Sequence, residues 1–280
     1  MPSAQIIVGR HSHRLRCAIA FAFTLAVVLI AGCSRSPTNV FQGYVEGEYV
    51  YVASPLGGTL TNLAVARGDQ LKSGQLLFTL ERGSEADALK SAELNLKQAE
   101  ASLKLSESML VRRKELRANN GVISPEELDQ AQMQRDADAA QVASLRAAVN
   151  RAKWSFDQKQ QFAPEDAFVQ DTLYRQGEFV TAGNPVVVLL PPENIKTRFF
   201  VPEAVLPRIK AGETVTVTID GAPRTYSATI NYISTQNEFT PPVIYSRENR
   251  AKLIYMIEAK FSPSDAAELR PGQPVDVTIP

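Results

Sequence analysis

Two long stretches of the chain repeat apolar and polar residues at a helical period. In the first, from about Ser84 to Asn119, the recurring positions alternate in steps of three and four residues: Leu89, Ala92, Leu96, Ala99, Leu103, Ser106 and Leu110. In the second, the same steps give Leu128, Ala131, Arg135, Asp138, Val142, Leu145, Val149, Ala152 and Phe156. This spacing is typical of coiled-coil seams. It predicts two long helices that pack along their length.

The residues between the two series predict a hairpin. Asn119-Asn120-Gly121 interrupts the first helix, and Ser124-Pro125-Glu126-Glu127 offers an N-cap, a proline at the first helical position and an acidic first turn. A turn this short makes the helices antiparallel, and we expect Pro164 to end the second one. Arms of about 35 residues would reach ~50 Å, farther than a small domain needs for its own core.

A second pattern, short apolar runs separated by glycine turns, lies on both sides of the hairpin. Residues 60–80 (LTNLAVARGDQLKSGQLLFTL) predict three short strands, and residues 169–189 (VQDTLYRQGEFVTAGNPVVVL) repeat the pattern. Gly68 and Gly74 fall on Gly177 and Gly183, and glycine suits turn positions where φ is positive. Each half holds too little core to stand alone. We therefore predict one β-module that is split by the hairpin.

The chain changes character again after Pro191-Pro192. Five runs of β-branched and aromatic residues predict a small antiparallel barrel, with a brief helix between Pro202 and Gly212. The runs are 195–201, 214–219, 224–234, 252–261 and 275–279.

Composition excludes several classes of function. Lys plus Arg and Asp plus Glu both number 30, so no basic field exists to bind nucleic acid. The two histidines, His11 and His13, lie ahead of Cys33, in a segment that resembles a secretory signal. A mature chain would therefore lack histidine for acid–base catalysis or zinc binding. We expect no enzymatic activity, cofactor or metal.

The N-terminus carries the parts of a secretory signal. Three arginines (Arg10, Arg14 and Arg16) precede an apolar run from Cys17 to Ile30. The run is shorter than the ~20 residues that span a bilayer. A cleaved signal is expected, and a retained signal-anchor is the alternative.

The order of these parts resembles the HlyD-type periplasmic adaptor proteins, also called membrane fusion proteins. The likeness is carried by residues 43–60, 68–74 (GDQLKSG), 177–183 (GEFVTAG), 198–203 (RFFVPE) and 237–253. It implies an α+β fold in which a lipoyl-like β-module, split by an α-helical coiled-coil hairpin, precedes a small antiparallel β-barrel. In lipoyl carriers the modified lysine lies where this chain has its helical insertion, so no lipoyl group is expected.

The resemblance also assigns domain boundaries. They are a lipoprotein signal peptide (1–32), an N-terminal tether (33–42), the first half of the module with a leading strand (43–82), the hairpin (83–163), the second half (164–192) and the β-barrel (193–280).

Adaptors of this family join an inner-membrane transporter to an outer-membrane TolC-type channel, commonly as rings of six. Residues 198–203 and 237–253 favour an ABC-type exporter as the partner, as does the end of the chain at the last barrel strand. The alternatives are an adaptor of a proton-driven RND pump and an envelope scaffold lipoprotein unconnected to export.

In related adaptors an Arg, Leu and Ser pattern at the hairpin tip contacts the channel. The matching residues here are Arg112, Leu116 and Ser124, with Arg113 as a rival for the arginine. The spacing from Leu116 to Ser124 is one residue longer than the family pattern. In the alternative, Ser124 is only a helix cap and Leu116 only the last seam residue.

Ile30-Ala31-Gly32-Cys33 resembles a bacterial lipobox. The resemblance implies that Cys33 becomes the acylated first residue and anchors the chain on the periplasmic side of a Gram-negative envelope. An adaptor is expected at the inner membrane. Ser34, the residue after the acylated cysteine, keeps anchoring in the outer membrane as an alternative.

Overall fold

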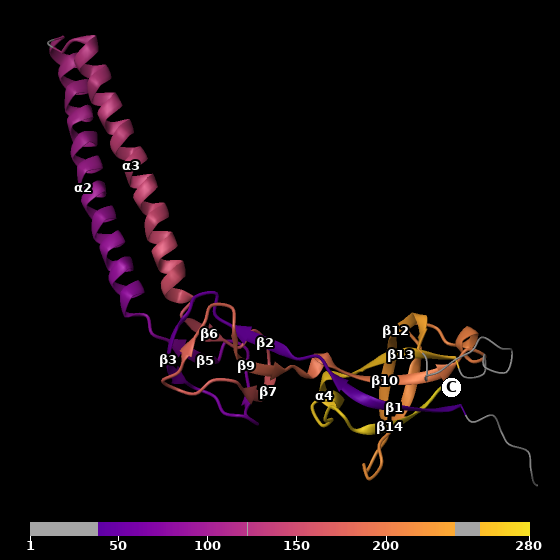
Figure 1. Cartoon of the computed structure of the whole chain (residues 1–280). Helices are drawn as coiled ribbons and strands as arrows, with labels where there is room; N and C mark the ends of the chain where they lie inside the picture. Colours follow the sequence, from indigo (N-terminus) through magenta and orange to yellow (C-terminus); the bar gives the residue numbers. More distant parts are fainter. Residues whose placement is uncertain (1–38, 122, 239–252) are drawn as a thin grey trace, which may run out of the picture.

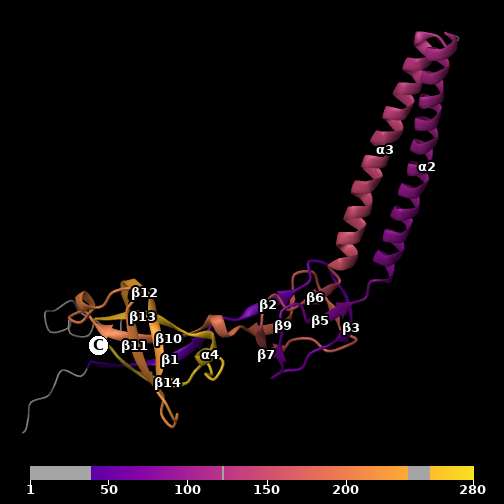
Figure 2. The same ribbon diagram turned by 180° about the vertical axis from the view of Figure 1, so that it is seen from behind.

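The computed structural model describes residues 39–121, 123–238 and 253–280. Three units follow one another in space: a helical hairpin at one end, a small β-module in the middle and a β-barrel at the other end (Figure 1). In the opposite view the hairpin again rises steeply from the line that joins the two β-units (Figure 2). The predicted α+β fold is confirmed.

Helices α2 (Gly83–Asn120) and α3 (Pro125–Asp157) form the hairpin. Every position of both predicted seams is buried or half-buried, although some of them are polar. Leu110, the last position of the first seam, is only 5% exposed. At the tip Gly121 adopts a left-handed conformation, and its N–H donates to the carbonyl of Arg117. The coiled-coil prediction is therefore confirmed.

The second helix is shorter than predicted. It ends at Asp157 rather than near Pro164, because residues Gln160–Phe162 form strand β6 and pair with the module. Ala163 is buried, and its N–H donates to the carbonyl of Gln75 at 2.8 Å. Residues 158–163 thus belong to the β-module, whereas the sequence analysis placed them in the hairpin.

The module consists of two four-stranded sheets, ordered β2-β9-β7-β4 and β6-β5-β3-β8. Each sheet combines strands from before and after the hairpin, so neither half has a sheet of its own. Fully buried side chains also come from both halves, for example Leu77 and Phe78 from the first and Val180 and Leu189 from the second. The strands are β2 (Val50–Ala53), β3 (Gly58–Leu63), β4 (Gln70–Leu71), β5 (Leu76–Leu80), β6 (Gln160–Phe162), β7 (Ala167–Thr172), β8 (Phe179–Val180) and β9 (Pro185–Leu190).

The glycine turns of the two halves have the same backbone conformation. Gly68 and Gly177 have φ of 94° and 95°, and Gly74 and Gly183 have φ of 79° and 80°. In both copies the carboxylate after the first glycine accepts a hydrogen bond from the backbone N–H three residues earlier, at 2.8 and 2.9 Å. These are type II turns, in which the third residue needs a positive φ.

The barrel closes in the order β1-β10-β13-β12-β11-β14. Its interior is apolar, with Phe199, Val217, Ile257 and Val277 fully enclosed. The strands are β1 (Val40–Gly47), β10 (Ile195–Pro202), β11 (Thr214–Thr218), β12 (Tyr226–Glu238), β13 (Ile254–Phe261) and β14 (Pro274–Thr278).

Strand β1 belongs to the barrel, although the sequence analysis divided its residues between the tether and the module. It pairs with β10 and β14 and buries Phe41 and Val45 in the barrel core. Gly43 lets β1 approach β10 closely, since an added Cβ would lie 2.3 Å from the carbonyl oxygen of Arg198. The sequence pattern of five runs lacked this sixth strand, which closes the barrel.

Two short helical segments also differ from the prediction. The brief helix expected between Pro202 and Gly212 is a single 3₁₀ turn, η2 (Leu206–Arg208), where proline limits the number of backbone donors. A helix that was not predicted, α4 (Pro263–Ala266), begins where the Ser262 hydroxyl accepts a hydrogen bond from the N–H of Asp265.

Candidate functional site: hairpin tip and barrel charge cluster

Ser124 fixes the start of α3 at the hairpin tip. Its hydroxyl accepts a hydrogen bond from the N–H of Glu127 at 3.2 Å, and the Glu127 carboxylate accepts one from the N–H of Ser124 at 3.0 Å. This reciprocal pair is a capping box. Ser124 itself is exposed, so the cap and a surface for a partner can coincide.

The two adjacent arginines of α2 have different environments. Arg113 is half-buried and donates to the carbonyl oxygen of Glu127 on α3, at 3.1 Å. It lies three residues after Leu110 and so continues the seam. Arg112 is exposed. Arg113 thus joins the two helices, whereas Arg112 lies at the surface.

Leu116 is 41% exposed and lies one turn after Arg112 on the same helix face. The alternative that Leu116 is the last seam residue is therefore wrong, because Arg113 takes the next seam position. Arg112 and Leu116 share a face of α2, and Ser124 lies across the turn at the start of α3.

An exposed apolar stripe, which was not predicted from the sequence, runs along α2. Its side chains are 41–59% exposed: Leu94, Leu105, Met109 and Leu116. At about 100° per residue they fall within roughly 60° of arc, on a side of the helix next to the seam near the tip and farther from it near the base. Their spacings of 11, 4 and 7 residues could have revealed them, since these are near-whole numbers of turns.

The outer face of α3 carries mostly small side chains. Around Met133, which is 63% exposed, the face carries small exposed residues at the same helical angle. They are Ala137, Ala140, Ser144 and Ala147. A polar groove of about 330 Å³ between the helices is lined in part by Gln98 and Gln141. The hairpin thus presents large apolar side chains on one helix and small ones on the other.

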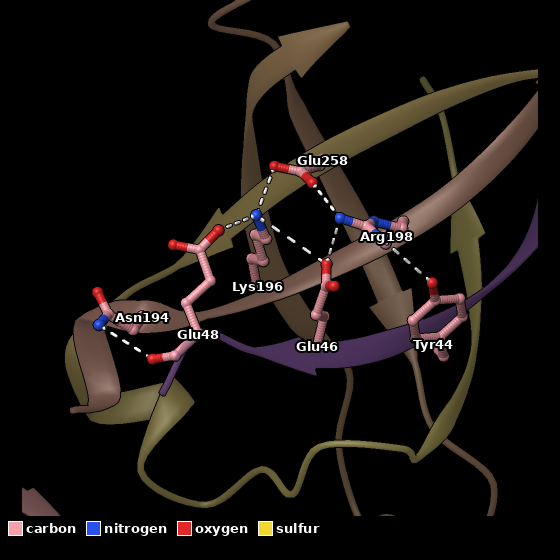
Figure 3. Close-up of polar contacts among 7 residues, drawn as sticks. All are labelled: Tyr44, Glu46, Glu48, Asn194, Lys196, Arg198 and Glu258. Carbon is pink, nitrogen blue, oxygen red and sulfur yellow. Dashed lines mark hydrogen bonds and ion pairs between the residues drawn. The ribbon is translucent and has the colours of Figure 1, made fainter. Parts of the chain in front are cut away.

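A cluster of charges lies on the outer face of the barrel, where β1, β10 and β13 are neighbours (Figure 3). Lys196 and Glu258 are only 7% and 8% exposed, and the Lys196 Nζ lies 2.7 Å from a Glu258 carboxylate oxygen. Arg198 Nη2 lies 2.8 Å from carboxylates of both Glu258 and Glu46. Lys196 also pairs with Glu48, which follows β1 in the chain.

In this cluster, ion pairing shifts the pKa values more than burial does. Burial by itself would lower the pKa of Lys196, but hydrogen bonds to Glu258 and Glu48 raise it above its usual value. Burial would likewise raise the pKa of Glu258, whereas the two cations lower it. The pKa of Arg198 is raised by the same pairing against the effect of burial. All three groups are therefore charged at neutral pH and act as structural ion pairs.

A second buried cation, Lys159, joins the hairpin to the module. It is 5% exposed and donates to the carbonyl oxygen of Gly57 at 2.7 Å. It also lies 3.0 Å from Glu85 in the first turn of α2. Burial would raise the pKa of Glu85, but the hydrogen bond from Lys159 lowers it. One side chain thus links the bases of both helices to the loop before β3.

Some predicted positions lie outside the described residues. Cys33 and the signal segment are among them, as is most of 237–253. In the described part of the chain, no group of three or more His, Cys, Asp or Glu side chains is arranged to hold a metal ion. Among those same residues, no helix has an apolar stretch long enough to cross a membrane.

Comparison with known proteins connects the hairpin to a family. Residues 88–159 match the family model described as RND MFP, alpha-helical hairpin domain. The match covers most of α2 and all of α3, and therefore both seams and the tip.

Relatives with low identity extend over most of the chain. A UPF0194 membrane protein of Citrobacter koseri is 27% identical over 313 residues, covering 91% of this chain and 94% of the relative. Another, encoded in the asrC 5′ region of Acidithiobacillus ferridurans, is 28% identical; 79% of this chain aligns with 60% of its length.

Solved structures share the fold. MacA from Actinobacillus actinomycetemcomitans has a TM-score of 0.65 at 19% identity, over 86% of this chain and 78% of MacA. The membrane fusion protein Spr0693 from Streptococcus pneumoniae has a TM-score of 0.61 at 18% identity, over 85% of this chain and 96% of Spr0693. The arrangement of hairpin, split module and barrel is thus that of membrane fusion proteins.

Proposed function

We propose that this chain is the periplasmic adaptor subunit of a tripartite efflux or secretion system. In this role it links an inner-membrane exporter to an outer-membrane TolC-type channel. The observation that carries the proposal is the hairpin: two long, closely packed helices that end in an exposed Arg112, Leu116 and capped Ser124. The match of residues 88–159 to the hairpin of membrane fusion proteins supports it.

The outer faces of the hairpin support a ring of copies. The apolar stripe of α2 is suited to pack on the small-residue face of α3 in the next copy, since large side chains fit against small ones. Because the two faces differ, the contact is head-to-tail and closes into a ring when the rotation permits. A hexamer is the number that the family resemblance implies.

For the transporter we favour an ABC-type exporter, on the sequence resemblance of RFFVPE at 198–203. An RND-type pump is the second candidate, and the matched hairpin family, which is described for RND proteins, favours it. Export that persists after a protonophore collapses the proton gradient, but stops when ATP is depleted, supports the ABC-type partner. The reverse result supports the RND-type partner.

The tip contact is tested by cysteine crosslinking in the cell envelope. A Ser124→Cys variant labelled with a thiol-reactive photocrosslinker should give a product with an outer-membrane channel, and Lys97→Cys, an exposed position of α2 far from the tip, should not. A Ser124→Cys variant that folds and reaches the envelope but gives no channel product would contradict the proposed docking.

A further inference from the structure

The barrel and the module have largely separate hydrophobic cores. The barrel core gathers residues mainly from β1 and β10–β14, and the module core gathers residues mainly from β2–β9, but Leu190 at the end of β9 packs in the barrel core. The chain crosses between the two units twice, once after Gly47 and once through η1 (Pro192–Asn194). Apart from Leu190, contacts around these two crossings therefore set the angle between the two units.

Polar contacts join the two crossings to each other. The N–H of Glu48 donates to the carbonyl of Asn194, and the Asn194 side-chain amide donates to the carbonyl of Glu48, each at 3.1 Å. Glu48 and Asn194 are thus paired like residues of two antiparallel strands. A contact that holds Glu48 against the barrel therefore also holds Asn194, and with it the second crossing.

Lys196 is positioned to hold Glu48. Its ammonium is fixed by Glu258 of β13 at 2.7 Å and is almost enclosed, and it reaches the Glu48 carboxylate at the end of β1 (Figure 3). The Glu48 side chain is 63% exposed, in contrast to the 10% of Glu258. Glu258 is therefore the buried partner of Lys196, and Glu48 is the exposed partner whose place water can take.

Space for movement exists at the same junction. A cleft of about 540 Å³ separates the module from α4, and Asp166, Pro192 and Pro263 line it. Across the junction, the Arg270 guanidinium lies 5.3 Å from the centre of the Phe168 ring, a contact that tolerates sliding. A change of angle would deform this cleft and shift Leu190 at the edge of the barrel core, while the rest of both cores stays packed.

We propose that Glu48 and Lys196 form a releasable latch that sets the angle between the barrel and the module. When the pair is closed, the two crossings are fastened to the barrel face. When it opens, the hairpin and module swing as one body relative to the barrel. The inference concerns this chain alone and does not depend on the proposed adaptor role.

The test measures the angle directly. Spin labels at Ser91→Cys on α2 and Thr216→Cys on β11, in the full chain with Cys17 and Cys33 replaced by serine, report the distance between hairpin and barrel. Glu48→Gln should raise the population of distances outside the wild-type peak about fivefold, the effect of losing one partly exposed ion pair. Concentrated salt should broaden the wild-type distribution and leave the variant unchanged.

Glu193→Gln is the matched control, because Glu193 is an exposed carboxylate of the second crossing outside the cluster. It should keep the wild-type distribution. Asn194→Ala, which removes the side-chain hydrogen bond to Glu48 but keeps the backbone one, should broaden it less than Glu48→Gln does. A Glu48→Gln distribution identical to the wild type, or an equal change in Glu193→Gln, would overturn the latch. Thermal unfolding of each variant establishes that both units remain folded.

Discussion

Arg113 on α2 donates a hydrogen bond to the backbone carbonyl of Glu127 on α3, 3.1 Å away, and so joins the helices beside the capping box. Its neighbour Arg112 is exposed. Two adjacent arginines thus divide the tasks of holding the tip together and presenting a charge at its surface.

This division predicts opposite results for the two arginines. Arg113→Met should lower the stability of the hairpin by about 1 kcal/mol, the net contribution of a hydrogen bond of this kind. Arg112→Met should leave stability unchanged. Hydrogen exchange of amides near the tip, read residue by residue, distinguishes the two. Equal protection in both variants would place Arg113 outside the helix contact.

The equivalent glycine turns of the two halves predict equal losses of stability when alanine replaces the glycine. Gly68→Ala and Gly177→Ala should each destabilise the chain by about 1–2 kcal/mol, because each substitution forces a residue with a Cβ into nearly the same positive φ. Gly83→Ala, in the first turn of α2, is the control and should be neutral or slightly stabilising. Denaturant unfolding gives the three values, and very different costs for Gly68 and Gly177 would contradict the backbone repeat.

The apolar stripe of α2 predicts self-association. Leu105→Glu should weaken association between copies at least about tenfold, since it places a charge where apolar surface would be buried. Lys104→Glu, at an exposed position about 100° round the helix from Leu105, should have little effect. Sedimentation over a range of concentrations measures both. Association that survives Leu105→Glu unchanged would assign the contact to another face.

The charge cluster predicts how stability depends on pH. The folded pKa of Glu258 is lowered, so its contribution is present above its unfolded pKa of about 4.3 and disappears as pH falls through the lower folded value. The pKa of Lys196 is raised, so its contribution is present below about 10.4 and disappears as pH rises through the higher folded value.

Wild-type stability should therefore vary little, as far as this cluster is concerned, between about pH 5 and 10. Glu258→Gln should cost about 3 kcal/mol at pH 7, because it leaves buried cations without their main partner, and the cost should shrink in acid. Urea unfolding at several pH values measures this. A cost that does not change between pH 7 and 3 would exclude the carboxylate as its source.

The proposed lipid anchor predicts a processing defect. Cys33→Ala should abolish incorporation of radiolabelled palmitate and leave the precursor uncleaved, since the acylated residue is missing. Cys17→Ala, within the expected signal, is the matched control and should be processed normally. Labelling that persists in Cys33→Ala would favour the retained signal-anchor.

Local patterns predicted most of the fold. The seams are spaced so that burial follows directly from the helical period, and the glycine turns occupy positions where only one conformation fits. The position of β1 was not predicted, because its pairing with β10 and β14 joins residues that lie far apart in the sequence. The early end of α3 was missed for the same reason, since β6 is specified by its partner β5 rather than by its own three residues.

The candidate site was predicted in part. The resemblance proposed Arg112, Leu116 and Ser124 as tip contacts but could not separate Arg112 from Arg113, because that choice depends on which side chain faces α3. The charge cluster left only a weak signal: alternate charges at 46 and 48, and again at 196 and 198. Their pairing depends on the register that sets Glu46 opposite Lys196 and Arg198 opposite Glu258, which no local pattern specifies.

Strand β1 has a consequence for the order of folding. It is among the first segments to be made, yet its partners are β10 and β14, and residues Val40 and Thr278 lie opposite each other at the two ends of the described chain. The hairpin can form from neighbours in sequence, the module must await β9, and the barrel closes only when the last strand arrives. Assembly should proceed outward from the middle of the chain, and a ribosome that stops before residue 274 leaves the barrel open.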